Sequence, residues 1–125
     1  MLTQRNPREA YRRVEFDARI NGASPQELVR LCYEQVISSL AGAMLAADRG
    51  DNLNKSRALT RAMSALTALQ MGVADEDGVA QALLHIYTAA RRAVLDSVLN
   101  FDPATLVRIR QDFVDISESM ARAAS

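Results

Sequence analysis

The stretch "LVRIRQDFVDISESM", from Leu106 to Met120, has the clearest hydrophobic pattern in the chain. Its apolar side chains recur at alternating steps of three and four residues, at Leu106, Ile109, Phe113, Ile116 and Met120. Because an α-helix completes a turn in roughly 3.6 residues, this spacing places all of them on one side. The stretch therefore predicts an amphipathic helix that buries one face against neighbouring elements.

Three earlier segments repeat this pattern, each with one apolar stripe. The first is expected from about Pro25 to Arg49, and its stripe is Val29, Tyr33, Val36, Leu40, Ala43 and Ala47. The second is expected from about Asn54 to Gly72, with a stripe of Leu59, Ala62, Met63, Leu66, Leu69 and then Val73. The third carries Ala80, Leu83, Tyr87, Ala90, Val94 and Val98. Strand-like alternation is sustained nowhere, so the sequence predicts helices alone.

Capping residues mark where these helices begin and end. Ser24 precedes a proline and is followed three residues later by Glu27, which is the arrangement of a capping box. Gly50 can adopt the left-handed conformation that ends the first helix, and Asp102 can cap the last. Helices of about 20 residues are roughly 30 Å long, and short joints between them favour antiparallel neighbours. We therefore expect an all-α fold, an antiparallel up-and-down four-helix bundle.

The segment before Ala23 differs from the rest of the chain. Two helical turns can follow Pro7, but an Asn-Gly pair then interrupts the pattern. We expect one domain over residues 1–125, with an N-terminal arm or short extra helix at 1–22 and the bundle at 23–123.

Length, charge and composition exclude several classes of protein. The chain has 125 residues, enough for one domain, and its 15 basic and 15 acidic residues cancel. The basic surface of a nucleic-acid-binding protein is therefore not expected. No apolar run approaches the roughly 18 residues of a membrane span. The start of the chain lacks the apolar segment of a signal peptide, and the single cysteine can form no internal disulfide. By elimination we expect a cytoplasmic protein without membrane insertion.

The first helix has more apolar surface than one core stripe needs. Leu28, Leu31 and Cys32 lie to one side of the stripe, and the same flank continues along Gln35, Ser39 and Gly42. In the third helix, Leu84 and Ile86 flank the Leu83–Tyr87 seam on either side. Neighbouring helices can cover this surface, or it can form a docking groove for a partner. In the second case, an arm containing Tyr11 could lie over part of the groove.

Signals for catalysis are poor. The chain has no glycine-rich phosphate loop, no paired-cysteine metal spacing and no His-x-x-x-His pair. Cys32 fits a small buried hydrophobe better than a nucleophile. His85 is expected to face solvent, as in a histidine phosphotransfer module, but Thr88 and Ala89 follow where such modules have a lysine and a small residue. We expect no enzyme, no cofactor and no metal site.

The stretch "ASPQELVRLCYE", Ala23 to Glu34, resembles the "ASPxELVxMLYD" signature of the FliS family of flagellin-specific export chaperones. A tyrosine upstream of the signature, often preceded by alanine, is matched by Ala10-Tyr11. The stretches "ALTALQMG" and "VAQALLHIYTAARRAV", at residues 65–72 and 79–94, are looser matches. The resemblance extends from Tyr11 to about Met120, and its first block is the specific one.

The resemblance implies a helical bundle without enzymatic activity. FliS proteins hold the disordered C-terminal segment of new flagellin in the cytoplasm, prevent its premature polymerisation and help to deliver it to the flagellar export gate. We expect a monomer when free, and the expected partner-binding residues are Tyr11, Leu28, Leu31, Cys32, Gln35, Ser39, Gly42, Leu84 and Ile86. Two alternatives remain open: a phosphotransfer module that uses His85, and an adaptor that binds some other helix in the same groove.

Overall fold

The computed structural model describes residues 21–124 and contains four helices in this range. They are α2 (Pro25–Asp48), α3 (Asn52–Gly72), α4 (Gly78–Leu99) and α5 (Pro103–Ala124). No residue from 21 to 124 is in a β-strand, so the predicted all-α fold is confirmed. The predicted arm and Tyr11 fall within residues 1–20, outside the part of the chain that the structure describes.

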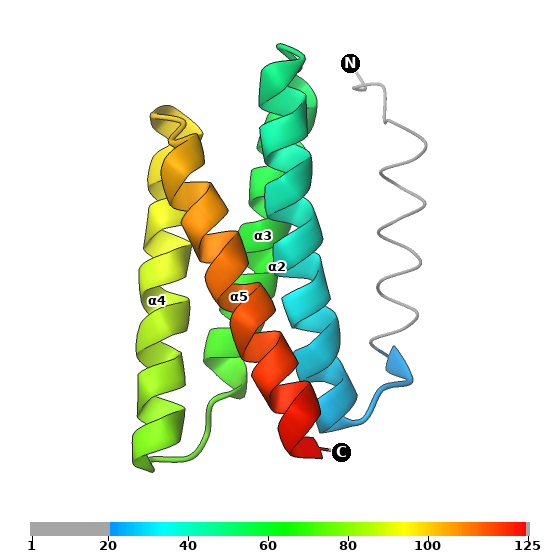
Figure 1. Ribbon diagram of the computed structural model, residues 1–125, viewed down its shortest axis with the longest axis vertical. Helices are drawn as coiled ribbons and strands as arrows, with labels where there is room; N and C mark the ends of the chain where they lie inside the picture. Colours follow the sequence, from blue (N-terminus) through cyan, green and yellow to red (C-terminus); the bar gives the residue numbers. More distant parts are fainter. Residues whose placement is uncertain (1–20, 125) are drawn as a thin grey trace. The chain divides into compact units, whose positions relative to one another are not determined.

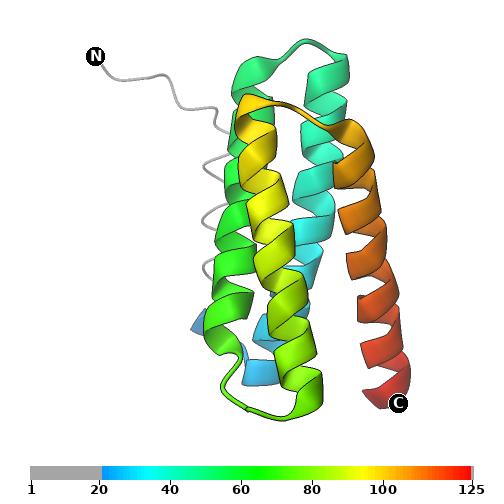
Figure 2. The ribbon, with the colours of Figure 1, turned by 90° about the vertical axis from the view of Figure 1, so that its left-hand side faces the viewer.

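The chain divides into two compact units, residues 1–31 and residues 32–125, with the boundary inside α2. In the second unit the helices lie side by side and run in alternating directions (Figures 1 and 2). The joints α2–α3 and α4–α5 lie at one end of this unit, and the joint α3–α4 lies at the other. The up-and-down four-helix bundle is thus confirmed, whereas the boundary between arm and bundle stays a prediction.

One hydrophobic core is shared by the four helices. It includes Tyr33, Val36 and Leu40 from α2, and its other buried members are Cys32, Ala43, Ala58, Leu59, Ala62, Ala65, Leu66, Leu69, Tyr87, Ala90, Val94, Leu106, Ile109 and Phe113. Burying such apolar side chains contributes about 1.5–3 kcal/mol for each large one, and this burial is the main force that assembles the bundle.

Three aromatic rings from three different helices meet in this core. The Tyr33 ring centroid lies 5.1 Å from that of Phe113 and 6.1 Å from that of Tyr87. The two tyrosine hydroxyl oxygens are 2.7 Å apart and share a hydrogen bond. Each buried hydroxyl thereby has a partner, and α2, α4 and α5 are tied together at one level.

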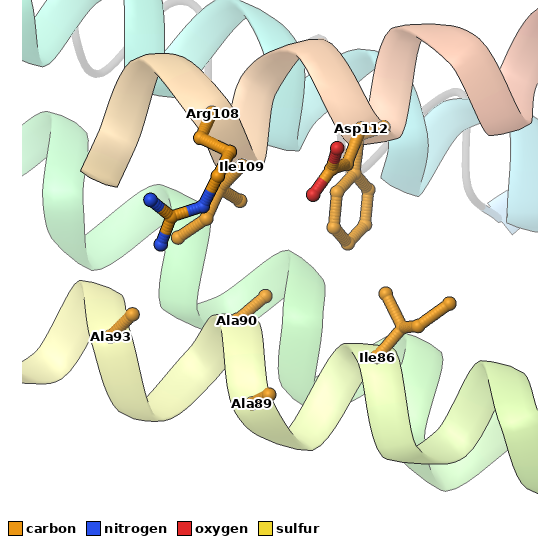
Figure 3. Close-up of a pocket in the computed structure, with 8 residues that line it drawn as sticks. Ile86, Ala89, Ala90, Ala93, Arg108, Ile109 and Asp112 are labelled. Carbon is orange, nitrogen blue, oxygen red and sulfur yellow. The ribbon is translucent and has the colours of Figure 1, made fainter. Parts of the chain in front are cut away.

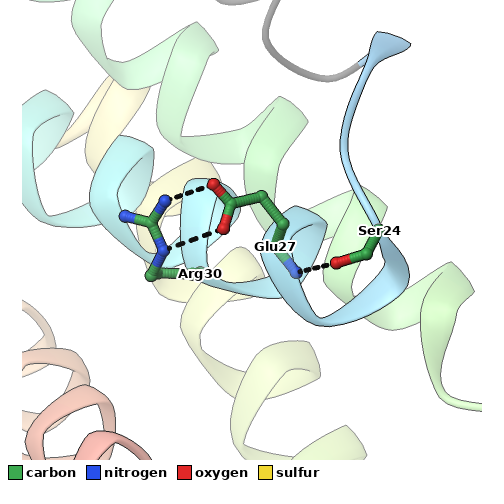
Figure 4. A network of polar contacts seen from close by, with 3 residues as sticks. All are labelled: Ser24, Glu27 and Arg30. Carbon is green, nitrogen blue, oxygen red and sulfur yellow. Dashed lines mark hydrogen bonds and ion pairs between the residues drawn. The ribbon is translucent and has the colours of Figure 1, made fainter.

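Side chains of the predicted type begin each helix. The backbone N–H of Glu27 donates to the hydroxyl of Ser24 at 3.2 Å, as the capping box requires (Figure 4). The Glu27 carboxylate forms an ion pair with Arg30, one turn further along α2. The predicted cap at α2 is therefore confirmed for the serine, and the glutamate supports the first turn through an i,i+3 pair.

Aspartates cap the other three helices. The carboxylates of Asp51, Asp77 and Asp102 accept hydrogen bonds from backbone N–H groups three residues ahead, at 3.1, 2.8 and 3.2 Å. Hydrogen bonds to Asp51 and Asp102 lower the pKa of both carboxyl groups. Gly50 has a φ of 68°, so the left-handed stop expected between α2 and α3 is confirmed.

The closed end of the α4–α5 joint contacts α3 through a cation over a ring. The ammonium of Lys55, in the first turn of α3, lies 4.9 Å from the centroid of Phe101. An exposed contact of this kind contributes about 0.5–1 kcal/mol. It connects the two joints that share this end of the bundle.

Two positions of the predicted stripes are wrong. Val29 is 36% exposed and Val98 is 44% exposed, although both share the direction of the core residues on their helices. A helical wheel gives the direction of a side chain around the axis, but it does not show whether another helix reaches the same height. The buried stripe of α2 therefore begins at the next turn, with Tyr33.

Candidate functional site

The predicted flank of α2 is partly open and partly buried. Leu28, Gln35 and Gly42 are half-buried, whereas Leu31 is only 1% exposed. Cys32 and Ser39 are buried as well. In this structure the flank is therefore a discontinuous surface, and its role in binding a partner stays a prediction.

Cys32 and Gly42 have packing roles in the bundle. Cys32 belongs to the core, and burial raises the pKa of its thiol, which disfavours the reactive thiolate. A Cβ atom on Gly42 would lie 3.9 Å from the Cβ of Ala58, so this glycine faces α3. The expected interpretation of Cys32 as a small buried hydrophobe is confirmed.

Two buried polar atoms in residues 21–124 have no hydrogen-bond partner. They are the hydroxyl oxygen of Ser39, on the flank of α2, and Nε of Arg110 on α5. A buried polar atom without a partner costs about 1–3 kcal/mol. These two atoms therefore reduce the stability of the bundle, although both residues keep their place on helices with well-packed neighbours.

The predicted residues of α4 face in opposite directions. Leu84 and Ile86 are both half-buried, and a separation of two residues places them roughly 200° apart around the helix. Ile86 lies on the side of α5, where it lines a pocket. The sequence thus located one side of this pocket correctly.

The pocket lies between α4 and α5 and has a volume of about 210 Å³ (Figure 3). Its apolar lining consists of Ile86, Ala89, Ala90, Ala93, Ile109 and Phe113. Two charged residues of α5, Arg108 and Asp112, complete the lining. The Arg108 side chain extends from α5 across the pocket toward α4, and the Asp112 carboxylate lies further along α5 (Figure 3).

Sequence reasoning missed the α5 side of this pocket. Arg108 and Asp112 read as solvated charges beside the Ile109–Phe113 seam. A signal was present on α4, where Ala89 and Ala93 leave little side-chain volume on the face that includes Ile86. Small side chains beside a helical seam can leave a groove, but they can equally allow the next helix to approach closely.

The opposite face of α4 is closed by α3. These two helices pack closely along their length, whereas α4 makes few contacts with α5. Two polar contacts also cross the α3–α4 interface: the Gln70 amide donates to the Thr88 hydroxyl at 3.0 Å, and Nε of Arg91 donates to the Thr67 hydroxyl at 2.9 Å.

No catalytic arrangement is found in the part of the chain that the structure describes. Within residues 21–124 no group of three His, Cys, Asp or Glu side chains could hold a metal ion. His85 is exposed on α4, as expected. Burial raises the pKa of both Tyr33 and Tyr87, and their shared hydrogen bond raises that of Tyr33 further, so both hydroxyls stay protonated at neutral pH. None of the four described helices is long and apolar enough to cross a membrane.

Comparison with known proteins agrees with this helical, non-catalytic surface. The model of the flagellar protein FliS family matches residues 7–124 of the chain. The chain is also 26% identical over 114 residues to the flagellar secretion chaperone FliS of Salmonella typhimurium (strain LT2). This alignment covers 89% of the chain and 84% of the relative. The family match spans nearly the whole chain, so this protein belongs to the FliS family.

Proposed function

We propose that this protein is a flagellar export chaperone that binds the disordered C-terminal segment of flagellin. The observation that carries the proposal is the family match over residues 7–124, supported by the similarity to a flagellar secretion chaperone. In the cytoplasm such binding would prevent premature polymerisation of flagellin and support its delivery to the flagellar export gate. The free protein is proposed to be a monomer.

The surface of the bundle supports this proposal in two places. The α4–α5 pocket has an apolar lining in which Ala89 is exposed and Ile86 and Ala93 are half-buried. The α2 flank offers Leu28 and Gln35, which are half-buried. A disordered client loses conformational entropy when it docks, so its affinity must come from several apolar contacts of moderate strength. Two separate apolar surfaces suit such a client better than one deep pocket.

Binding to flagellin tests the proposal directly. The protein is mixed with the flagellin encoded in the same genome, either full-length or without its C-terminal segment, and the complex is measured by co-elution and calorimetric titration. We expect full-length flagellin to bind, the truncated form to lose binding, and filament formation to slow in sedimentation assays. Equal binding of the two flagellins, or binding of neither, would overturn the proposal.

A pair of charge substitutions on α2 tests the flank. Leu28→Glu is expected to weaken flagellin binding and to keep the thermal transition, because Leu28 is half-buried near the helix start. Val36→Glu is expected to unfold the bundle, since Val36 is fully buried and an unpaired buried charge costs several kcal/mol. If both variants lose thermal stability equally, Leu28 belongs to the core and the flank has no binding role.

A further inference from the structure

We propose that the α4–α5 pocket binds an amphipathic helix of the client, and that Arg108 and Asp112 select a helix with an acidic and a basic side chain one turn apart. The identity of the client rests on the proposed function. The type of occupant follows from the lining of the pocket, which comes from two helices within the unit of residues 32–125.

The size of the pocket favours a polypeptide over a small molecule. Its volume of about 210 Å³ is below the roughly 300–1,000 Å³ of typical small-molecule sites. Its floor is already well packed, since Phe113 is 1% exposed and Ala90 and Ile109 are each 6% exposed. What remains open is room for one or two apolar side chains of a partner that continues beyond the pocket.

The shape of the lining favours a helix over an extended segment. An extended segment needs partners for its backbone N–H and C=O groups, and the surfaces of α4 and α5 have satisfied their own backbone groups internally. A helix brings its backbone hydrogen bonds with it and presents only side chains. Ala89 and Ala93 leave space for such a helix to approach α4, because the distance between helix axes depends on the side chains at the contact.

The charges beside the pocket add a preference for the partner's sequence. Arg108 and Asp112 are four residues apart on α5, which corresponds to about 6 Å along the helix axis. Arg108 lies near Asp102 and helps to lower the pKa of that carboxyl group. The Asp112 carboxylate makes no hydrogen bond or ion pair with any residue from 21 to 124. A partner helix with an acid near Arg108 and a base near Asp112 would complement both charges, which favours the correct register and direction.

Filling the pocket tests its occupant. Ala89→Trp places a large side chain at an exposed lining position, and Ala68→Trp does the same at an exposed position of α3 that does not line the pocket. A fluorescently labelled peptide of the flagellin C-terminal segment is titrated against the wild type and both variants. We expect Ala89→Trp to weaken binding roughly tenfold or more and Ala68→Trp to change it less than about twofold. Circular dichroism of each variant confirms that the fold is retained.

Exchanging the charges tests the selection. The double variant Arg108→Asp with Asp112→Arg keeps the net charge and is expected to weaken binding several-fold at low salt, with a smaller loss at about 0.5 M salt. A peptide whose acid and base are exchanged should regain affinity for this variant. The peptide should also gain helical circular dichroism when it binds the wild-type protein.

The outcomes separate this inference from the proposed function. No binding of the peptide to the wild type would contradict the proposed function itself. Binding that tolerates Ala89→Trp would overturn the pocket as the site, while the chaperone assignment would stand. Binding without a gain in helicity would overturn the helical occupant, and indifference to the charge exchange would overturn the selection by Arg108 and Asp112.

Discussion

Helix α4 has two neighbours, and it contacts them in different ways. Along α3 it packs closely, and polar contacts from Gln70 and Arg91 cross the interface. Along α5 it makes few contacts and leaves a pocket lined mostly by apolar side chains. The same helix thus closes one side of the bundle and leaves the other side open. A bundle can keep a partner surface exposed in this way because a different interface supplies its stability.

The largest effect is expected at the floor of the open side. Phe113→Ala removes a ring that is 1% exposed and contacts the rings of Tyr33 and Tyr87. Truncating a buried phenylalanine costs about 3–5 kcal/mol, so urea unfolding should show a loss of this size. Val107→Ala, at a position of α5 that is 54% exposed, is the control and should change stability by less than about 0.5 kcal/mol. A small loss at Phe113 would mean that α5 hardly contributes to the core.

The shared hydroxyl hydrogen bond should give an intermediate effect with a distinctive pattern. Tyr33→Phe or Tyr87→Phe alone leaves the other hydroxyl buried without a partner, which costs about 1–3 kcal/mol. The double variant removes both hydroxyls and should regain much of this loss. A double-mutant cycle from thermal and urea unfolding measures the coupling. Strictly additive losses would show that the two hydroxyls do not depend on each other.

The closed side should respond more weakly to loss of a polar contact. Arg91→Met keeps the length of the side chain and removes the hydrogen bond from Nε to the Thr67 hydroxyl. We expect a loss of about 0.5–1.5 kcal/mol in urea unfolding, because apolar packing carries most of this interface. Thr67→Val should give a similar value. A loss as large as that of Phe113→Ala would reverse the comparison between the two sides of α4.

The smallest effect is expected at the exposed cap of α5. Hydrogen bonds from Thr105 lower the pKa of Asp102 below its ordinary 3.8. Protonation therefore favours the unfolded chain: the stabilisation is complete above pH 3.8 and is lost as the pH falls through the folded-state value. Asp102→Asn should make stability less dependent on pH between pH 5 and 2, as followed by urea midpoints. An unchanged pH dependence would mean that the cap contributes nothing measurable.

The fold could be predicted from the sequence because its signals are local. Caps at Ser24 and Asp102, the stop at Gly50 and the Leu106–Met120 stripe each depend on residues within a few positions of one another. The pocket could be predicted only on one side. Ile86 stood out as surplus apolar surface, but the contributions of Arg108 and Asp112 depend on how far α5 lies from α4. That distance is set by packing between helices far apart in sequence, which a hydrophobic period does not encode.

The contact between Lys55 and Phe101 has a practical consequence for chemical labelling. Lys55 is the only lysine in the chain, so an amine-reactive reagent has one side-chain target besides the terminal amine. Its ammonium lies over the ring where the α4–α5 joint meets α3, so its acylation rate should follow how tightly that end stays closed. Mass spectrometry of this one residue, with and without flagellin, would report on the end of the bundle through a single chemical reaction.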